Sequence, residues 1–181
     1  MLAEIALYIL DIARNSLDAG STRVEISLTV TDNARVSFRI IDNGRGMDED
    51  TLAHALVPGF SLSGISGRGY GLPTLKKAAL DAFGSFSLRS SPGHGTCVEV
   101  SFCMDCALSP VLGDVEETVR LLVITNPGVD FLYTRNQNGR TASMDTASFR
   151  EILGQLYQPM QPEILTYIQD YLCQMRLSLL S

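Results

Sequence analysis

The residues of this chain whose types and spacing could do chemistry begin with the segment Ile41-Asp-Asn-Gly-Arg-Gly-Met47. Alternating apolar residues precede it, so we expect a strand that ends here in a glycine-rich loop. The Asp42 carboxylate can accept a hydrogen bond from the amino group of an adenine ring. Gly44 and Gly46 have no side chain, which lets the backbone pass close under such a ring. The loop is weak evidence alone, because many strands end in turns of this composition.

A second set of polar residues lies near the N-terminus. Asp11 and Asn15 are four residues apart, which places them on one face of a helix, and Tyr8 and Asp18 extend this stripe. An Asn amide oxygen is a good Mg²⁺ ligand when phosphates complete the shell. A carboxylate one turn earlier could polarise a water or hydroxyl aimed at a γ-phosphate. The alternative is the solvated surface of an amphipathic helix, and for this stripe in isolation that interpretation is favoured.

Two further segments could complete a nucleotide site. Gly67-Arg-Gly-Tyr-Gly-Leu72 precedes a predicted helix, and its alternate glycines could turn backbone N–H groups toward an anion. It follows no strand of a βαβ unit and is not a P-loop, so neither a Rossmann site nor a P-loop is predicted. Thr96 follows Gly95 and could place a hydroxyl beside Asp42. Taken singly, the first segment is often only a flexible loop, and the second only a β-turn that enters a strand.

The elements that must position these residues follow from hydrophobic periodicity. The order up to residue 102 is α-β-β-α-β-β, apart from a short helix over 48–57, and a sheet with helices packed on one face satisfies it. In this first part we predict helices over 2–18 and 71–83 and strands over 24–30, 36–40, 85–90 and 96–102. After residue 106 we predict helices over 113–125, 149–157 and 163–176 and strands over 129–134 and 141–144. The predicted fold is therefore α+β, a two-layer α/β sandwich with a small C-terminal α/β annex.

Composition excludes several classes of protein. The chain has 181 residues, of which 45% are hydrophobic and 19% charged, as in ordinary globular proteins. A net charge of -6 without a Lys/Arg cluster argues against binding to nucleic acid or to an anionic membrane. The apolar runs are too short to cross a bilayer and the N-terminus lacks a secretory signature, so we expect a cytoplasmic protein.

Four cysteines are present, and two of them, Cys103 and Cys106, form a C-x-x-C pair. A zinc site normally needs two such pairs or nearby histidines. The chain has two histidines, His54 and His94. Reduced thiols are therefore favoured over a metal or redox role, although both remain open.

Together the Asp11-x-x-x-Asn15 helix, the DNGxGM loop, the GxGxGL loop and the late Gly-Thr resemble the four motifs of the Bergerat-fold ATPases. That superfamily includes DNA gyrase, the large heat-shock chaperones, MutL mismatch-repair proteins and histidine kinases. The resemblance covers residues 1 to about 104, which we predict to be a histidine-kinase-like ATP-binding domain, followed by the annex over 105–181.

The resemblance implies a role for each matching residue. Asp42 would bind the adenine amino group, with Thr96 in support, and Asn15 would hold Mg²⁺. Asp11 stands where many relatives carry a Glu general base, and Asp is one methylene shorter. The remaining cofactor contacts would come from Asp18, from the base-pocket residues Gly44, Gly46 and Met47, and from the phosphate-loop residues Gly67, Gly69, Gly71 and Leu72.

The branch of the superfamily decides the expected function. Asn15-Ser-Leu-Asp-Ala-Gly20 resembles the MutL helix, whereas the short GRGYGL loop resembles histidine kinases and anti-sigma-factor kinases. Leu112-Gly-Asp-Val and Asn126-Pro-Gly-Val-Asp-Phe131 resemble stand-alone ATP-binding proteins associated with iron-hydrogenase gene clusters. The leading hypothesis is a stand-alone Mg-ATP-binding protein that phosphorylates or regulates a protein partner. The alternatives are an ATP-dependent clamp that forms a homodimer, and a degenerate interaction module without turnover.

Overall fold

The computed structural model describes residues 4–32, 34–60, 69–154 and 157–179. Its helices are α1 (Ile5–Asp18), α2 (Glu49–His54), α3 (Gly71–Asp81), α4 (Val115–Thr125), α5 (Thr146–Leu153) and α6 (Pro162–Ser178). Its strands are β1 (Arg23–Thr31), β2 (Arg35–Asp42), β3 (Ser85–Ser90), β4 (Thr96–Cys103), β5 (Asp130–Gln137) and β6 (Arg140–Asp145).

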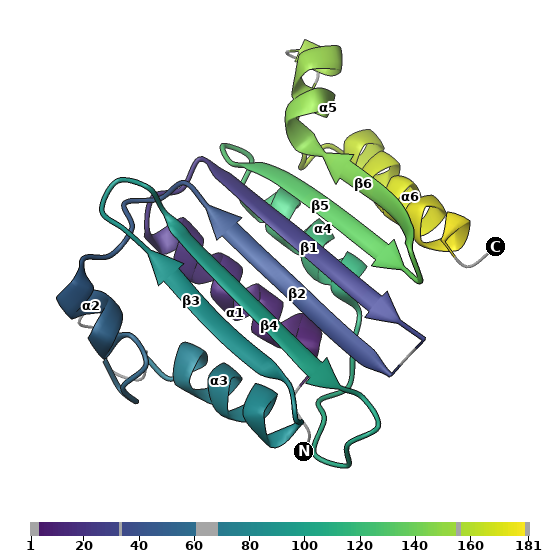
Figure 1. Ribbon diagram of the computed structural model, residues 1–181. Coiled ribbons are helices and arrows are strands. Elements are labelled where there is room, and N and C mark those ends of the chain that lie inside the picture. The colour runs from purple at the N-terminus through teal and green to yellow at the C-terminus, as the bar shows by residue number, and fades with distance from the viewer. Residues whose placement is uncertain (1–3, 33, 61–68, 155–156, 180–181) are drawn as a thin grey trace.

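The named strands form one mixed sheet in the order β3-β4-β2-β1-β5-β6. β1 pairs in parallel with β5, and the other neighbouring pairs are antiparallel. Figure 1 shows this sheet with α1 and α4 lying behind it. Because β2 lies beside β4, the loop that follows β2 and the start of β4 meet at the same end of the sheet.

One face of the sheet carries the hydrophobic core. In β1, Val24, Ile26, Leu28 and Val30 are buried, and the residues between them are partly exposed. α1 packs on β2, α3 on β3 and β4, α4 on β5 and α6 on β6. Burial of alternate residues is typical of a sheet that is covered on one side and solvated on the other. The predicted α+β class, with helices packed on one face of a sheet, is confirmed, and the sheet is mixed.

α1 forms because its apolar residues recur at helical spacing and bury one side of the helix against β2. Ile5, Ile9 and Ile12 lie in that buried stripe. Gly20 follows the helix with φ +78, which is the left-handed conformation that glycine adopts without strain. The predicted termination of this helix at Gly20 is therefore confirmed.

The C-terminal segment continues the same sheet. β5 pairs with β1 along its whole length, from Arg23 opposite Asp130 to Val30 opposite Gln137. Beneath it lies a buried polar cluster in which Glu116 Oε1 accepts hydrogen bonds from Tyr133 Oη (2.8 Å) and Arg135 Nη1 (2.6 Å). Burial beside a carboxylate raises the pKa of the Tyr133 phenol well above its usual range. The division into domains at residue 104 stays a prediction.

Several predicted element boundaries differ from the structure by a few residues, among them the start of α5 and the end of α2. α5 begins at Thr146 rather than 149, because the Asp145 carboxylate accepts a hydrogen bond from Ala147 N (2.9 Å) and caps the helix there. α2 ends at His54 rather than 57. Among the described residues, no helix is both long and apolar enough to cross a membrane.

Candidate functional site

Asp42, the last residue of β2, is buried on the helical face of the sheet. Its Oδ1 accepts hydrogen bonds from the backbone N–H groups of Gly44 (2.9 Å) and Thr96 (3.2 Å). Its Oδ2 accepts a hydrogen bond from the Ser16 hydroxyl (2.7 Å). A carboxylate offers about four lone-pair sites, so these three donors fix its orientation and leave one acceptor site on Oδ2.

The loop after β2 packs so tightly that two glycines are needed in it. A Cβ on Gly44 would lie 2.7 Å from Ser21 Oγ, and a Cβ on Gly46 would lie 2.0 Å from the carbonyl oxygen of Ser91. Gly46 also has φ +67, a conformation that side chains disfavour. Asn43 fixes the loop to the start of β1, since its Oδ1 accepts from the N–H groups of Thr22 and Arg23, both at 2.9 Å.

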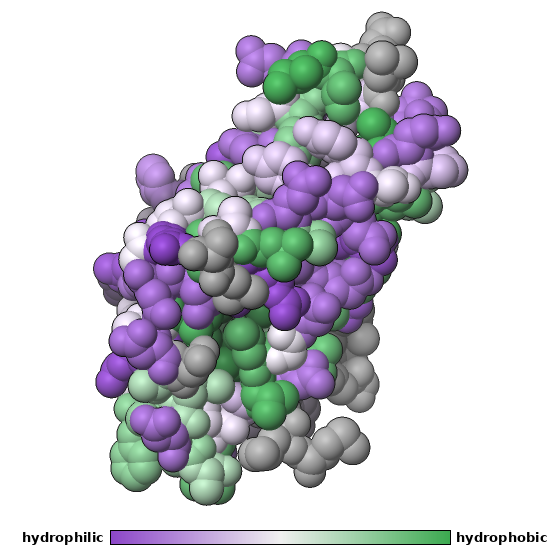
Figure 2. Space-filling model, turned by 90° about the vertical axis from the view of Figure 1, so that its right-hand side faces the viewer, coloured by the Kyte–Doolittle hydropathy of each residue, from purple (hydrophilic) through white to green (hydrophobic). Residues whose placement is uncertain are grey.

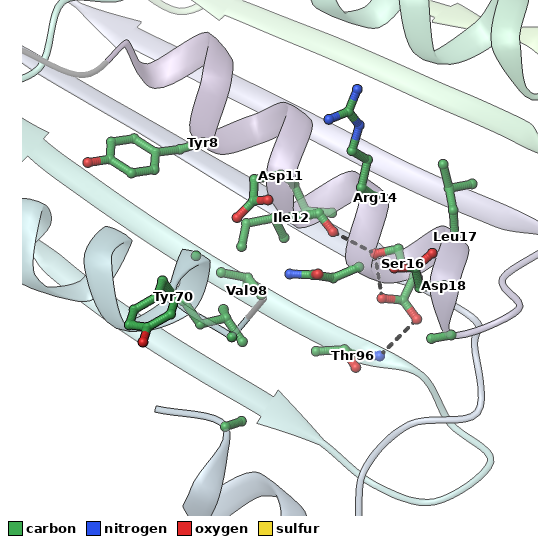
Figure 3. A pocket seen from close by; sticks show the side chains of 18 of the residues that line it. Tyr8, Asp11, Ile12, Arg14, Ser16, Leu17, Asp18, Tyr70, Thr96 and Val98 are labelled. Atoms are coloured by element: carbon green, nitrogen blue, oxygen red, sulfur yellow. Dashed lines mark hydrogen bonds between the residues drawn. The ribbon is translucent and has the colours of Figure 1, made fainter. Parts of the chain in front are cut away.

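α1 brings the predicted polar stripe to the same place. Asp11, Asn15 and Asp18 are exposed along this helix and line one cavity. Figure 3 shows Tyr8 and Asp11 along α1, and it shows Ser16 of α1 and Thr96 of β4 joined by hydrogen bonds to one carboxylate, that of Asp42. Tyr8 is partly buried at its margin, and this burial raises the pKa of the Tyr8 phenol.

The start of α3 closes another side of the cavity. A Cβ on Gly69, which has φ +94, would lie 2.1 Å from the carbonyl oxygen of Phe60. Gly71 is the first residue of α3, and the helix has no side-chain hydrogen bond at its N-cap. The next residue, Leu72, is half-buried and packs against the core. Gly67, the other predicted residue of this loop, lies outside the described residues.

These elements enclose a cavity of about 1130 Å³, which is large enough for a nucleotide. It brings together nearly all the described residues that the sequence predicted for the site. The members that line it are Asp11, Asn15, Asp18, Asp42, Gly46, Met47, Gly69, Gly71, Leu72 and Thr96. Gly44 is the exception, because it lies against Ser21 and Ala19 at the turn of the loop.

The chemistry of the lining suits a purine nucleotide with phosphates. At one end Asp42 offers an acceptor to an amino group. At the other, the N-terminus of α3 has no side-chain hydrogen bond at its N-cap and presents the positive end of a helix dipole, which favours phosphate. The exposed Asn15 lies on the helix between them and has an amide oxygen that suits Mg²⁺ when phosphates supply further ligands.

No group of three or more His, Cys, Asp or Glu side chains that could hold a metal ion occurs in the described ranges. All four cysteines, Cys97, Cys103, Cys106 and Cys173, are free thiols. Any Mg²⁺ would therefore depend on phosphate oxygens for most of its ligands.

Two serines of the site were not predicted from the sequence. Ser16 lies in the apolar stripe of α1, and a lone hydroxyl in such a stripe was the available signal. Ser90, the last residue of β3, contacts both the loop after β2 and the start of β4. Nothing in its local sequence distinguishes it from an ordinary strand end, because its partners are distant in sequence.

Comparisons with known proteins identify the family and the relatives of this chain. Residues 3–105 match the family described as histidine kinase-, DNA gyrase B-, and HSP90-like ATPase. The chain is 31% identical over 115 residues to the cell-division control histidine kinase PdhS of Brucella anthropi, which covers 56% of this chain and 11% of that protein. It is 34% identical over 79 residues to the DNA mismatch repair protein MutL of Rhodospirillum rubrum, which covers 38% of this chain and 12% of the relative. The chain thus spans about a tenth of the length of these relatives.

Solved structures share the fold. The Aquifex aeolicus MutL ATPase domain complexed with ADP superposes with a TM-score of 0.53 at 18% identity, covering 87% of this chain and 70% of that one. The N-terminal domain of a DNA repair protein gives a TM-score of 0.56 at 15% identity and covers 85% of this chain and 56% of that one. The family match extends over more than half of the residues and includes every predicted site residue that lines the cavity. The chain therefore belongs to the histidine kinase-, DNA gyrase B- and HSP90-like ATPase family.

Proposed function

We propose that this protein binds Mg-ATP in the cavity between α1, the loop after β2 and the start of α3, and uses it to phosphorylate or regulate a partner protein. The observation that carries the proposal is the Asp42 carboxyl group. It is buried, fixed by three donors and left with one acceptor position at the cavity. An adenine amino group is the donor that this position suits.

The rest of the cavity supports the phosphate end of the proposal. Phosphates at the N-terminus of α3 would meet backbone N–H groups that have no side-chain cap. Asn15 would contribute an amide oxygen to Mg²⁺, and Asp18 continues the polar face of α1 along the cavity. Bound Mg²⁺ would supply charge neutralisation for phosphoryl transfer.

Asp11 is the proposed base. Its carboxylate lies at the start of α3, close to where the terminal phosphate would lie. Asp11 would take the proton from a water or an acceptor hydroxyl as the new O–P bond forms and the bond to ADP breaks. The side chain is one methylene shorter than Glu, so the distance from Asp11 to the attacking oxygen decides whether turnover occurs.

The C-terminal segment is the proposed partner-binding surface, because the nucleotide cavity uses almost none of it. At the end of the molecule formed by α5, Figure 2 shows apolar surface, and Ile152 of that helix is 80% exposed. A protein partner fits this surface better than nucleic acid does, since the chain has a net charge of -6. A cytoplasmic location also remains part of the proposal.

A second candidate is an ATP-dependent clamp that forms a homodimer. The likeness to MutL favours it, because the MutL ATPase domain and the DNA repair N-terminal domain each superpose on more than four fifths of this chain. The two candidates differ in what ATP does: it changes the oligomeric state in a clamp and is consumed on a partner in a kinase.

Calorimetric titration of ATP and ADP, each with and without Mg²⁺, tests the proposal. Magnesium-dependent binding of ATP is expected, and light scattering of the same samples distinguishes a monomer from an ATP-induced dimer. Absence of binding at millimolar nucleotide would overturn the proposed function. Binding without phosphate release or transfer to a partner would favour an interaction module that has lost turnover.

A further inference from the structure

Ser90 does not itself line the cavity, but its hydroxyl forms a junction of hydrogen bonds between two segments that do. Its Oγ lies 2.9 Å from Met47 N, 2.7 Å from the carbonyl oxygen of Gly95 and 3.1 Å from Thr96 Oγ1. These partners come from the loop after β2 and from the entry to β4. Ser90 and Thr96 are direct neighbours across β3 and β4, and the N–H of Thr96 is bonded to Asp42.

The direction of each hydrogen bond at Ser90 follows from the chemistry of its partners. A carbonyl oxygen can only accept, so the single hydroxyl proton of Ser90 is donated to Gly95. The N–H of Met47 can only donate, so Ser90 accepts from it. Ser90 therefore has no proton left for Thr96, and the contact between the two hydroxyls requires Thr96 to be the donor.

This assignment of donors and acceptors determines which hydrogen bonds the Thr96 hydroxyl can make to a ligand. The one hydroxyl proton of Thr96 points to Ser90, so toward the cavity the Thr96 oxygen can only accept. Asp42 lies beside it and likewise accepts, with one position free on Oδ2. The base end of the cavity thus presents two acceptors and, from these two side chains, no donor.

We propose that Ser90 is a specificity-determining positioning residue, which orients the Thr96 hydroxyl so that the site selects a purine with a 6-amino group over one with a 6-oxo group. The inference rests on the proposed function, since it concerns how that site chooses its base. An amino group supplies two N–H donors to the two acceptors. An oxo group would place its lone pairs against theirs, and leaving buried polar groups unpaired is costly.

The test compares the affinities of ATP and inosine triphosphate, which differ at the 6-position where hypoxanthine carries an oxo group. In Ser90→Ala the Thr96 hydroxyl can rotate and donate, so the preference for ATP should fall about tenfold while the fold persists. Ser90→Thr keeps the hydroxyl and should retain the preference. Ser91→Ala is the matched control, because Ser91 is the exposed neighbour and has no part in the junction.

A structural role alone would lower both affinities in parallel and leave their ratio unchanged, which would overturn the inference. If Ser90→Ala does not fold, Thr96→Val removes the acceptor itself and should weaken ATP more than inosine triphosphate; equal weakening would overturn the inference as well. If the wild-type protein binds ATP and inosine triphosphate equally, the selectivity is wrong but the site stands. If it binds neither, the proposed function itself fails.

Discussion

The Asp11 carboxylate lies directly against Gly71, the first residue of α3: a Cβ on Gly71 would be 1.8 Å from Asp11 Oδ2. Asp11, the proposed base, therefore lies next to the start of α3, where the phosphates are proposed to bind, and both line the cavity. A carboxylate at the N-terminus of a helix is favoured by the helix dipole. Glycine at this position leaves room for that contact.

Gly71→Ala should lower the rate of ATP hydrolysis without lowering the stability of the fold. Gly71 has no positive φ, and the nearest atoms that its Cβ would meet are those of the flexible Asp11 side chain, so the fold should not weaken. The new methyl group would push the flexible Asp11 side chain aside, and any ATP hydrolysis should fall about tenfold or more. Thermal unfolding and phosphate release measure the two effects. Unchanged hydrolysis would mean that the position of Asp11 does not matter.

Ser16→Ala should weaken ATP binding without unfolding the protein. The Ser16 hydroxyl donates to Asp42 Oδ2 across 2.7 Å, and hydrogen bonds to charged groups contribute about 1.5–3 kcal/mol. The expected loss of ATP affinity is about tenfold or more. Ser21→Ala is the control, since Ser21 is also buried but donates to the backbone oxygen of Ser16. An equal loss of affinity in both variants would indicate general loosening of the site.

Asp42→Asn should abolish ATP binding. The amide would keep an oxygen toward the N–H groups of Gly44 and Thr96, so its NH₂ group would replace Oδ2 at the cavity. A donor would then face the adenine amino group, and affinity should fall by at least about a hundredfold. Calorimetry measures the affinity, and circular dichroism checks the fold. Affinity near that of the wild type would rule out Asp42 as the base-recognition group.

The fold followed from local patterns wherever periodicity was strong. Alternation in β1 and the 3.6-residue spacing in α1 predicted both elements to within a few residues, because burial on one face requires those periods. The parallel pairing of β5 with β1 was not predicted, since a parallel neighbour is joined through distant chain and leaves no local signal.

In the candidate site, too, residues with a local signal were predicted and residues that depend on distant partners were not. Asp42 and Gly46 were predicted because a carboxylate can accept a hydrogen bond and a glycine lets the backbone approach a ligand, whatever the fold. Ser16 and Ser90 were missed because their roles depend on partners 26 and 43 residues away. A hydroxyl is ordinary in a sequence until the fold shows what it contacts.

Asp11→Asn should preserve ATP binding and remove turnover. The amide has nearly the same shape as the carboxylate but cannot take a proton from an attacking oxygen. General-base contributions are typically 10²–10⁴-fold, so phosphate release should fall by about a hundredfold or more. Asp50→Asn removes the same charge on exposed α2, outside the cavity, and should change neither property. Normal turnover in the Asp11 variant would exclude Asp11 as the base.

Glu116→Gln should destabilise the fold while leaving ATP affinity unchanged. Glu116 and Arg135 form a buried ion pair at 2.6 Å, and Tyr133 donates to the same carboxylate oxygen. Removing one partner of such a pair costs about 3–5 kcal/mol, because the other charge stays buried without compensation. Urea unfolding measures the loss. In the double variant Glu116→Leu/Arg135→Met neither charge remains, so the loss should be smaller than the sum of the losses in Glu116→Leu alone and Arg135→Met alone. A loss equal to that sum would show that the two side chains are not coupled.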